Sequence, residues 1–520
     1  MISIKSFLRR NGKPSSSKPH EESLAAPSLF SRDPLDFDLV SQLTHMSAVA
    51  TSGISRDRLF EGTAKLDYST SRFFRRVHLV AQRLNYDYSR ACEMVAERTG
   101  PDSVQNLLLR FATALSAGEP EEQFLARETE VQLELYGKKY ERDIESLRKW
   151  TDAYVALMVS STLIVVISMV SMMIYSMGAG IIVGLSFIVL MVTIAGTWVI
   201  FSSAPHEVKT HRLARKSPEQ YQMARLAQIL LPVAAVFGAV LGITFGLGPA
   251  LIASGLALAP VGYVAFRDDW KVDARDDEIA SFLRALGGVM DAVGTTVTEG
   301  LSRLNRRSLG ALEPHVRRLY VRLGNDIAPQ LCWLRFAGET GSELVSRSVR
   351  IFWDGLRLGG DPAQVGSLSS NFAQRLSLLR ATRKMVSSTF AWVVVPLHVV
   401  LLAIMLLITE VMRIFGGELA KVQDQSLNSD IVSEAGVNNL LLYSAPNMTF
   451  IHLFVGVMIV LLTAANSFAP YAAAGGSRYK ICLFASIMLF ISGIAVITIP
   501  AAVSALFESV SATPSTGTTP

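Results

Sequence analysis

The pentapeptide AGETG (Ala337–Gly341) repeats the Ala start and the Thr-Gly ending of AERTG (Ala96–Gly100), 241 residues earlier in the chain. Three glycine pairs share the same offset of 241: Gly53 with Gly294, Gly100 with Gly341, and Gly118 with Gly359. Glycine is a common residue, so a single coincidence carries no information. Three pairs at one constant offset indicate an internal duplication, and the pentapeptide marks its centre.

The residues around these glycines follow a helical pattern. Apolar residues recur every three or four positions, as in LLLRFATAL and IASFLRALGGVM, and period-two alternation is absent. A glycine after such a run closes a helix, because left-handed backbone costs little without a Cβ atom. Thr99 and Thr340 stand one residue earlier, and Asp102 and Glu343 are typical of the first turn of a new helix. We therefore expect a helix–helix corner at each copy; the alternative is a ligand-binding turn.

The composition indicates a membrane protein with large water-exposed parts. Half of the 520 residues are hydrophobic and only 18% are charged, against about 25% in average globular chains. Seven stretches are long and apolar enough to cross a bilayer: 153–176, 180–201, 227–246, 248–266, 387–409, 449–470 and 480–506. The third and fourth are separated by only a few residues, which predicts a tight hairpin.

The charges beside these spans set the expected orientation. The segment 202–225 is rich in Lys and Arg, whereas the loop 412–447 is mainly acidic. Under the positive-inside rule the first lies in the cytoplasm and the second outside. Seven spans through the cell membrane then place the N-terminus in the cytoplasm and the C-terminus outside.

These observations predict an all-α, polytopic membrane protein with two duplicated cytoplasmic helical bundles. Its expected divisions are a disordered tail (1–33), a first bundle with a stalk helix (34–150), four spans (151–266), a second bundle (267–385), three spans (386–508) and a second disordered tail (509–520).

No motif predicts catalysis, a cofactor or a metal site. The chain lacks G-x-x-x-x-G-K-[ST], H-E-x-x-H and G-x-S-x-G, and its three cysteines are far apart in sequence. We therefore expect a protein that is not an enzyme. His398, His452 and Asn466 fall inside predicted spans. Hydrogen bonding between helices is the favoured role for them, and a polar path in a transporter or receptor is the alternative.

Paired arginines are the most distinctive basic feature of the two bundles. They are Arg75 and Arg76 in the first bundle, and Arg306, Arg307, Arg317 and Arg318 in the second. One interpretation is a solvated face close to anionic lipid headgroups. The other is a docking surface for an acidic protein partner, since arginine forms interfaces more readily than lysine. No compact basic stripe points to nucleic acid.

Two glycine-punctuated bundles, each followed by spans, resemble the inner-membrane platform family of type II secretion and type IV pilus machines. The segment TGSELVSRSVRIFWDGLRLGGDPAQVGSLSSNFAQRLSLLRATRK (Thr340–Lys384) is most similar to the archaeal branch, which builds archaella and archaeal pili. The resemblance implies docking of a hexameric cytoplasmic secretion ATPase, insertion of pilin or archaellin subunits, and a homodimer. It supplies no catalytic residues, and the extra spans depart from the simplest platform.

Overall fold

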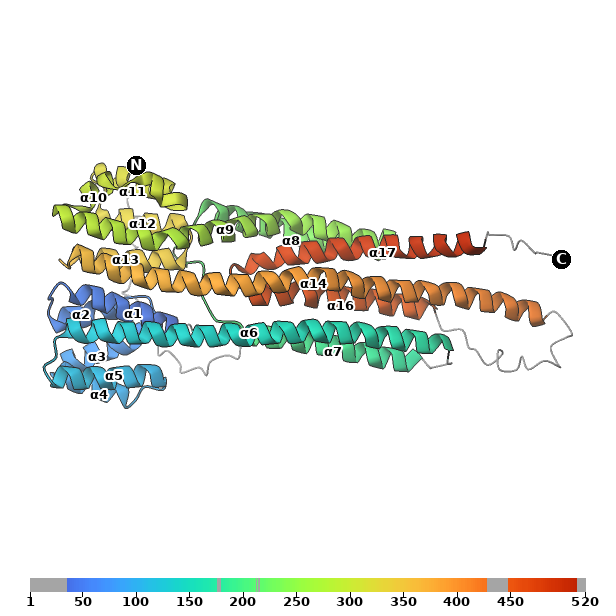
Figure 1. The fold of residues 1–520 in the computed structure, drawn as a ribbon, viewed down its shortest axis with the longest axis horizontal. Coiled ribbons are helices and arrows are strands. Elements are labelled where there is room, and N and C mark those ends of the chain that lie inside the picture. The colour runs from blue at the N-terminus through green and yellow to red at the C-terminus, as the bar shows by residue number, and fades with distance from the viewer. Residues whose placement is uncertain (1–34, 175–178, 212, 214–215, 428–447, 512–520) are drawn as a thin grey trace, which may run out of the picture.

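The computed structural model describes residues 35–174, 179–211, 213, 216–427 and 448–511 as an elongated helical molecule. Two groups of short helices lie side by side at one end, and long apolar helices extend from them toward the other end (Figure 1). No strand is present in these residues; the only bridge pairs Thr210 with Ser342. The all-α fold predicted from the sequence is confirmed.

The two groups of helices follow the same order along the chain. The first consists of α1 (Leu35–Ala50), α2 (Arg56–Ala64), α3 (Ser71–Leu84), α4 (Tyr88–Ala96), α5 (Asp102–Ser116) and the start of α6 (Glu121–Ile174). The second consists of the end of α9 (Leu247–Val293), α10 (Val297–Arg303), η1 (Arg306–Leu312), α11 (Glu313–Gly324), α12 (Pro329–Thr340), α13 (Glu343–Arg357) and the start of α14 (Pro362–Leu427). Each glycine pair falls at equivalent corners: after α1 and α9, after α4 and α12, and after α5 and α13.

Five of the six paired glycines adopt the left-handed backbone that was expected. The φ angles are positive at Gly53, Gly118, Gly294, Gly341 and Gly359. The prediction is wrong for Gly100, which is absent from the positive-φ residues. Pro101 follows it, and a residue before proline is biased toward extended backbone. Helix α4 also ends earlier, at Ala96, so Thr99 lies in the connection, whereas Thr340 is the last residue of α12.

Among the described residues, six helices are long and apolar enough to span a membrane; they lie in α6, α8 (Pro218–Phe245), α9, α14, α16 (Met448–Ala474) and α17 (Ile481–Ser511). The remaining predicted span, 180–201, falls in α7 (Ala179–Ser203), whose described apolar stretch is the shorter Phe187–Ser203. The expected hairpin is present, since only Gly246 separates α8 from α9.

The predicted outer loop, 412–447, begins later than expected. Helix α14 continues to Leu427, so 412–427 is helical, and Glu410 and Arg413 form an ion pair along it. Proline is absent from this stretch and charged residues alternate with apolar ones, which lets the helix continue beyond its apolar part. The rest of that loop (428–447) and the whole predicted N-terminal tail (1–33) lie outside the described residues. The predicted C-terminal tail (509–520) begins too early, because α17 continues to Ser511, and its remainder (512–520) is also outside the described residues.

Glycines allow the apolar helices to approach closely. A Cβ atom built on Gly255 of α9 would lie 2.9 Å from the backbone nitrogen of Phe490 in α17, and one on Gly262 would lie 2.6 Å from Leu483 Cα. Gly248, seven residues before Gly255, also faces α17. These glycines, spaced seven residues apart, let the apolar half of α9 pack closely against α17, as small residues do in membrane helix pairs.

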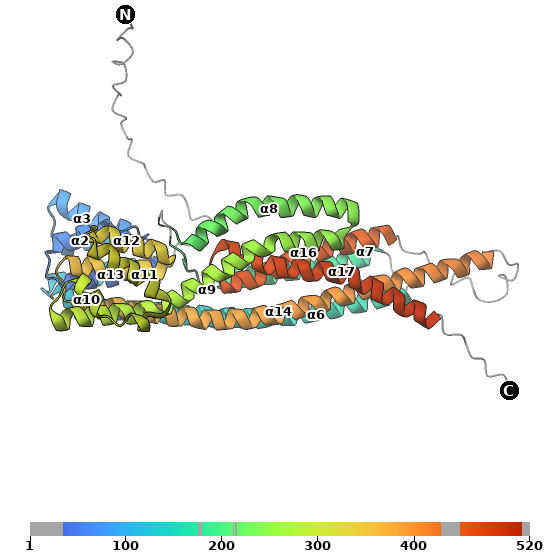
Figure 2. The same ribbon diagram turned by 90° about the horizontal axis from the view of Figure 1, so that it is seen from above.

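The two bundles are joined rather than separate. Helix α1 packs against α6 of its own bundle and also against α13 and α14 of the second. One buried cluster accordingly contains Phe37 and Val40 of α1 together with Phe352 and Phe372 of the second bundle. Figure 2 shows the bundles at one end and the apolar helices extending from them, with α8 on the outer side.

Candidate functional site: the charged junction between bundles and apolar helices

A stripe of acids on α9 marks the junction between the apolar helices and the second bundle. Asp269, Asp273 and Asp276 follow the apolar part of α9 at intervals of four and three residues, so they share one helix face. All three are largely buried; Asp276 is 2% exposed. Buried carboxylates require partners of opposite charge, and three other segments supply them.

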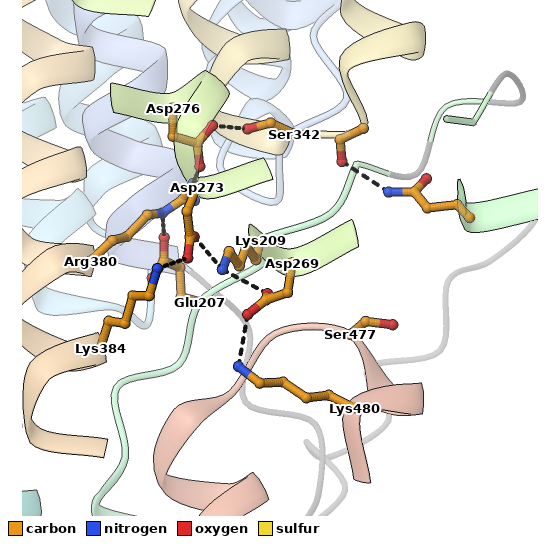
Figure 3. A network of polar contacts seen from close by, with 12 residues as sticks. Glu207, Lys209, Asp269, Asp273, Asp276, Ser342, Arg380, Lys384, Ser477 and Lys480 are labelled. Atoms are coloured by element: carbon orange, nitrogen blue, oxygen red, sulfur yellow. Dashed lines mark hydrogen bonds and ion pairs between the residues drawn. The ribbon is translucent and has the colours of Figure 1, made fainter. Parts of the chain in front are cut away.

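Lysines from three segments pair with this acid stripe (Figure 3). Lys209, in the connection between α7 and α8, contacts Asp269 at 2.6 Å and also pairs with Asp273. Lys480, at the start of α17, reaches the other oxygen of Asp269 at 2.7 Å. Lys384 of α14 reaches Asp273 at 2.8 Å. The stripe therefore ties α9 to α14, to α17 and to the connection after α7.

Arg380 of α14 continues the network on the side of the first bundle. It pairs with Asp276 and with Glu207, and it is only 9% exposed. Tyr140 of α6 donates a hydrogen bond to the second oxygen of Glu207 at 2.9 Å. Because Tyr140 lies on the stalk of the first bundle and Asp276 on that of the second, Arg380 connects both stalks.

Burial and charge act oppositely on the acids of this network. Burial alone would raise the pKa of Asp269, but Lys480 and Lys209 outweigh it and lower that pKa to about 2. For Asp276 burial prevails over the charge of Arg380 and raises the pKa to about 6. Asp269 is thus a permanent anion, and Asp276 is the member of the network that titrates near neutral pH.

The repeated motif of the second bundle docks onto this network. Ser342 donates a hydrogen bond to Asp276, and it also caps α13 by accepting from the backbone N–H of Val345. Arg275 donates to the carbonyl of Thr340, and the side chain of Gln220 donates to the carbonyl of Gly341 at 3.2 Å. The corner after α12 is thereby fixed to α8 and α9.

The matching corner of the first bundle has no such role. Thr99 donates its hydroxyl hydrogen bond to Val95, in the helix that precedes it, and Gly100 is exposed. The two copies of the motif are therefore both helix corners, as predicted, but only the second contacts the junction.

A second charged contact fastens the two bundles to each other. Arg347 of α13 pairs with Asp38 of α1 at 2.6 Å and with Glu343 at 2.7 Å, and it donates a hydrogen bond to Ser41 at 2.8 Å. Its guanidinium also lies 4.1 Å from the ring centroid of Phe37. A single buried side chain thus satisfies polar groups of both bundles.

A chain of hydrogen bonds links five apolar helices. Tyr154 of α6 donates to Asn466 of α16 at 2.6 Å, and Asn466 lies 2.9 Å from the Nδ1 atom of His398 in α14. The Nε2 atom of His398 lies 3.0 Å from Ser492 of α17, and Thr197 of α7 donates to Tyr154. The structure thus places His398 and Asn466 in contacts between helices, the role favoured from the sequence; His452 lies near the start of α16 and is not part of the chain.

The paired arginines lie apart from the junction. Arg75, Arg76, Arg307, Arg317 and Arg318 are exposed, and the side chain of Arg306 is not among those described. Arg75 donates to the carbonyl of Ala64 at the end of α2, and Arg318 contacts His315 and Glu339. Arg76, Arg307 and Arg317 have no side-chain ion pair among the described residues, and Arg76 and Arg317 lie on the regular helices α3 and α11.

Sequence reasoning missed the junction, although a signal was present. Asp269, Asp273 and Asp276 lie on one face of a helix just after an apolar stretch, a pattern that needs buried bases elsewhere. Their partners, Lys209 and Arg380, are 60 and more residues away in sequence, so no spacing rule connects them. Among the described residues no group of His, Cys, Asp or Glu side chains is arranged to hold a metal ion. The arrangement is suited to transmitting force between segments.

Comparison with known proteins finds relatives of this chain among archaeal proteins. No family model matches the chain, and no solved structure matches it. The chain is 24% identical over 320 residues to flagella accessory protein J of Methanocaldococcus jannaschii, a match that covers 59% of this chain and 57% of the relative. It is equally 24% identical over 321 residues to flagella accessory protein J of Methanococcus voltae, with the same coverage. The match thus spans just over half the length of these relatives. The resemblance to the archaeal branch of the platform family is confirmed at this level: the chain is similar to archaeal proteins named flagella accessory protein J.

Proposed function

We propose that this protein is the membrane platform on which an archaellum or a related archaeal pilus is assembled. The observation that carries the proposal is the continuity of three helices, α6, α9 and α14, from the bundles into the apolar region. Similarity to two proteins named flagella accessory protein J supports it. In this role the chain performs no chemistry; it transmits movement.

The stiffness of the three helices supports this mechanical role. Helices α6 and α14 contain 54 and 66 residues, so they are about 80 and 100 Å long at a rise of about 1.5 Å per residue. The charged junction fixes them to α9 and α17. A displacement of the bundles would therefore move the apolar helices as one body, and with them the pilin-like subunits that they contact.

The energy is proposed to come from a hexameric secretion ATPase that docks on the cytoplasmic bundles. Exposed arginines without ion pairs, Arg76 on α3 and Arg317 on α11, are the proposed contacts. We further propose that the bundles face the cytoplasm, as the basic segment 202–225 indicates, and that the platform is a homodimer.

Affinity capture of the full chain, solubilised in detergent, tests this function. The tagged protein should retain a secretion ATPase encoded beside it, and deletion of its gene should remove the surface filament. The variant Arg76→Glu/Arg317→Glu should weaken ATPase retention, because it reverses two unpaired charges. Arg98→Glu, at an exposed position outside these clusters, is the matched control. Normal filaments in the deletion strain would refute the platform role, and unchanged retention by the double variant would refute docking through these arginines.

A further inference from the structure

A groove runs along the seam between the two bundles. It has a volume of about 750 Å³ and is lined by α1 and α2 on one side and by α12 and α13 on the other. A second hollow of about 450 Å³ shares Asp67, Ser346 and Arg350 with it and extends it along the seam. The four helices that line the groove, α1, α2, α12 and α13, lie at the bundle end of the molecule (Figure 1).

The wall formed by α12 and α13 is apolar and contains unsatisfied hydrogen-bond donors. Leu331 and Leu334, one helical turn apart on α12, are 49% and 50% exposed. The indole N–H groups of Trp333 and Trp353 are buried without any acceptor. Buried donors without partners are unfavourable and rare in folded proteins. Both tryptophans line the groove, so a small turn of either ring toward it would bring its N–H group to an acceptor supplied by an occupant.

The charges along the groove favour an acidic occupant. Arg58 and Arg350 form no ion pair among the described residues. Two of the three lining acids are already engaged: Glu61 with Lys65 at 2.6 Å, and Asp354 with His45 at 3.0 Å. Asp67, exposed at the edge, is the remaining acid. Arg350 lies over the ring of Tyr68, 5.9 Å from its centroid, and close enough to Asp354 to lower the pKa of that carboxyl, but neither arginine is in an ion pair within the described residues.

We propose that this groove binds an acidic amphipathic helix of a protein partner. Apolar side chains of that helix would cover Leu331 and Leu334, and its carboxylates would pair with Arg58 and Arg350, as in other helix-in-groove complexes. Carbonyl or carboxylate oxygens would accept from the two indoles. The bound helix would touch both bundles at once, above the Arg347 contact that fastens them. The seam groove is a surface separate from the paired arginines, and binding of a helix there does not depend on the filament function.

A binding measurement on the full chain in nanodiscs of zwitterionic lipid, which do not attract a cationic peptide by charge, tests the proposal. The probe is a fluorescein-labelled peptide of about 14 residues, four helical turns, with leucines on one face and glutamates beside them. Fluorescence anisotropy should show saturable binding to the protein and none to empty nanodiscs. A peptide with lysine in place of every glutamate should not bind. Absence of binding by the acidic peptide, or equal binding by the lysine peptide, would overturn the proposal.

Variants of the groove assign the binding to this seam. The double variant Arg58→Gln/Arg350→Gln should lower the affinity for the acidic peptide by about tenfold or more, because two charge pairs are lost. Leu334→Glu, at a half-exposed position that tolerates substitution, should weaken it similarly through lost apolar contact and charge repulsion. Arg98→Gln removes an exposed charge elsewhere and should bind like the unaltered protein. If the groove variants bind as tightly as this control, the peptide binds elsewhere and the proposal is wrong.

Discussion

Lys209 is the residue on which the charged junction depends most. Its ammonium group pairs with Asp269 and Asp273, and it is held at 16% side-chain exposure by the chain around it. Burial would lower the pKa of Lys209, but these two acids more than compensate and raise it. Lys209 therefore stays charged at neutral pH.

Replacing Lys209 with methionine leaves two carboxylates without their shared partner. Removing one member of a buried ion pair typically costs about 3–5 kcal/mol, so Lys209→Met should lower the free energy of unfolding by about that amount. Thermal unfolding in detergent measures the effect. Lys138→Met, which breaks an exposed pair with Glu134, should unfold almost like the unaltered protein. Equal unfolding temperatures for the two variants would show that the junction adds nothing to stability.

Protonation of Asp276 makes the stability of the folded protein depend on pH. Its pKa is about 6 in the folded protein, above its ordinary value of 3.8. The folded state therefore binds an extra proton between these values, and stability from this carboxyl rises as the pH falls through the window. Relative to Asp276→Asn, the unaltered protein should gain about 1 kcal/mol per pH unit between pH 6 and pH 4.5, because the carboxyl of the folded protein is only half protonated at its pKa. Asp269, with a pKa of about 2, does not titrate there. Parallel unfolding profiles for the two proteins would contradict the shift.

At the scale of elements, the contact between α9 and α17 depends on glycine. A Cβ atom at Gly255 would lie 2.9 Å from the backbone nitrogen of Phe490 and 3.0 Å from the carbonyl of Ser486. Neither is the end of a flexible side chain, so the helices must separate. Gly255→Val should therefore destabilise the protein by about 1–3 kcal/mol, the usual cost of overpacking.

Gly288 of the same helix supplies the matched control for this prediction. No atom lies within 4 Å of a Cβ built there. Gly288→Ala should raise stability by up to about 1 kcal/mol, because alanine favours helix more than glycine. Thermal unfolding of both variants in detergent compares them directly. A destabilised Gly288→Ala, or an unaffected Gly255→Val, would show that space around the glycines does not set the packing of α9.

Helix ends and connections were predictable where they depend on residues that are neighbours in the sequence. Gly294 and Gly341 close helices as expected, and the α8–α9 hairpin is where the apolar pattern placed it. Gly100 was not predictable from its repeat partner because Pro101 changes its backbone. The apolar pattern predicts where the span ends, at 409, but not where its helix ends, so the continuation of α14 to Leu427 was not predictable from it.

The charged junction could not be predicted from neighbouring residues in the sequence, for a different reason. Lys209, Glu207 and Lys480 come from a loop and a short turn, whose positions depend on how the apolar helices pack. Only the acid stripe on α9 is visible in sequence. The pairing of Arg347 with Asp38, 309 residues apart along the chain, is likewise a property of how two bundles associate.

At the scale of the whole molecule, three helices cross the junction without a break. Ion pairs join α9 to α14 there, and the hydrogen bond from Tyr140 to Glu207 joins α6 to them. In the proposed function these parts act as one lever. The seam groove lies at one end of this lever, and the hydrogen-bonded chain through His398 lies among the apolar helices. A partner that moved the helices at the seam would also move the apolar helices, because continuous helices connect the two. The proposed platform function needs such a connection.

Interrupting one arm of the lever separates mechanical coupling from folding and docking. Glu145 is exposed on α6 between the first bundle and the apolar stretch, and its pairing with Lys149 at 3.8 Å is weak. Proline there removes a backbone hydrogen bond and clashes with the preceding turn, at a cost of about 3 kcal/mol. If the chain is a platform, Glu145→Pro should insert in the membrane and retain the ATPase while electron microscopy counts far fewer filaments, and Glu145→Ala should assemble normally. Full filament numbers with the proline variant would mean that α6 does not transmit force. Loss of ATPase retention as well would mean that the substitution disturbs the bundle, and the separate binding measurement reveals that case.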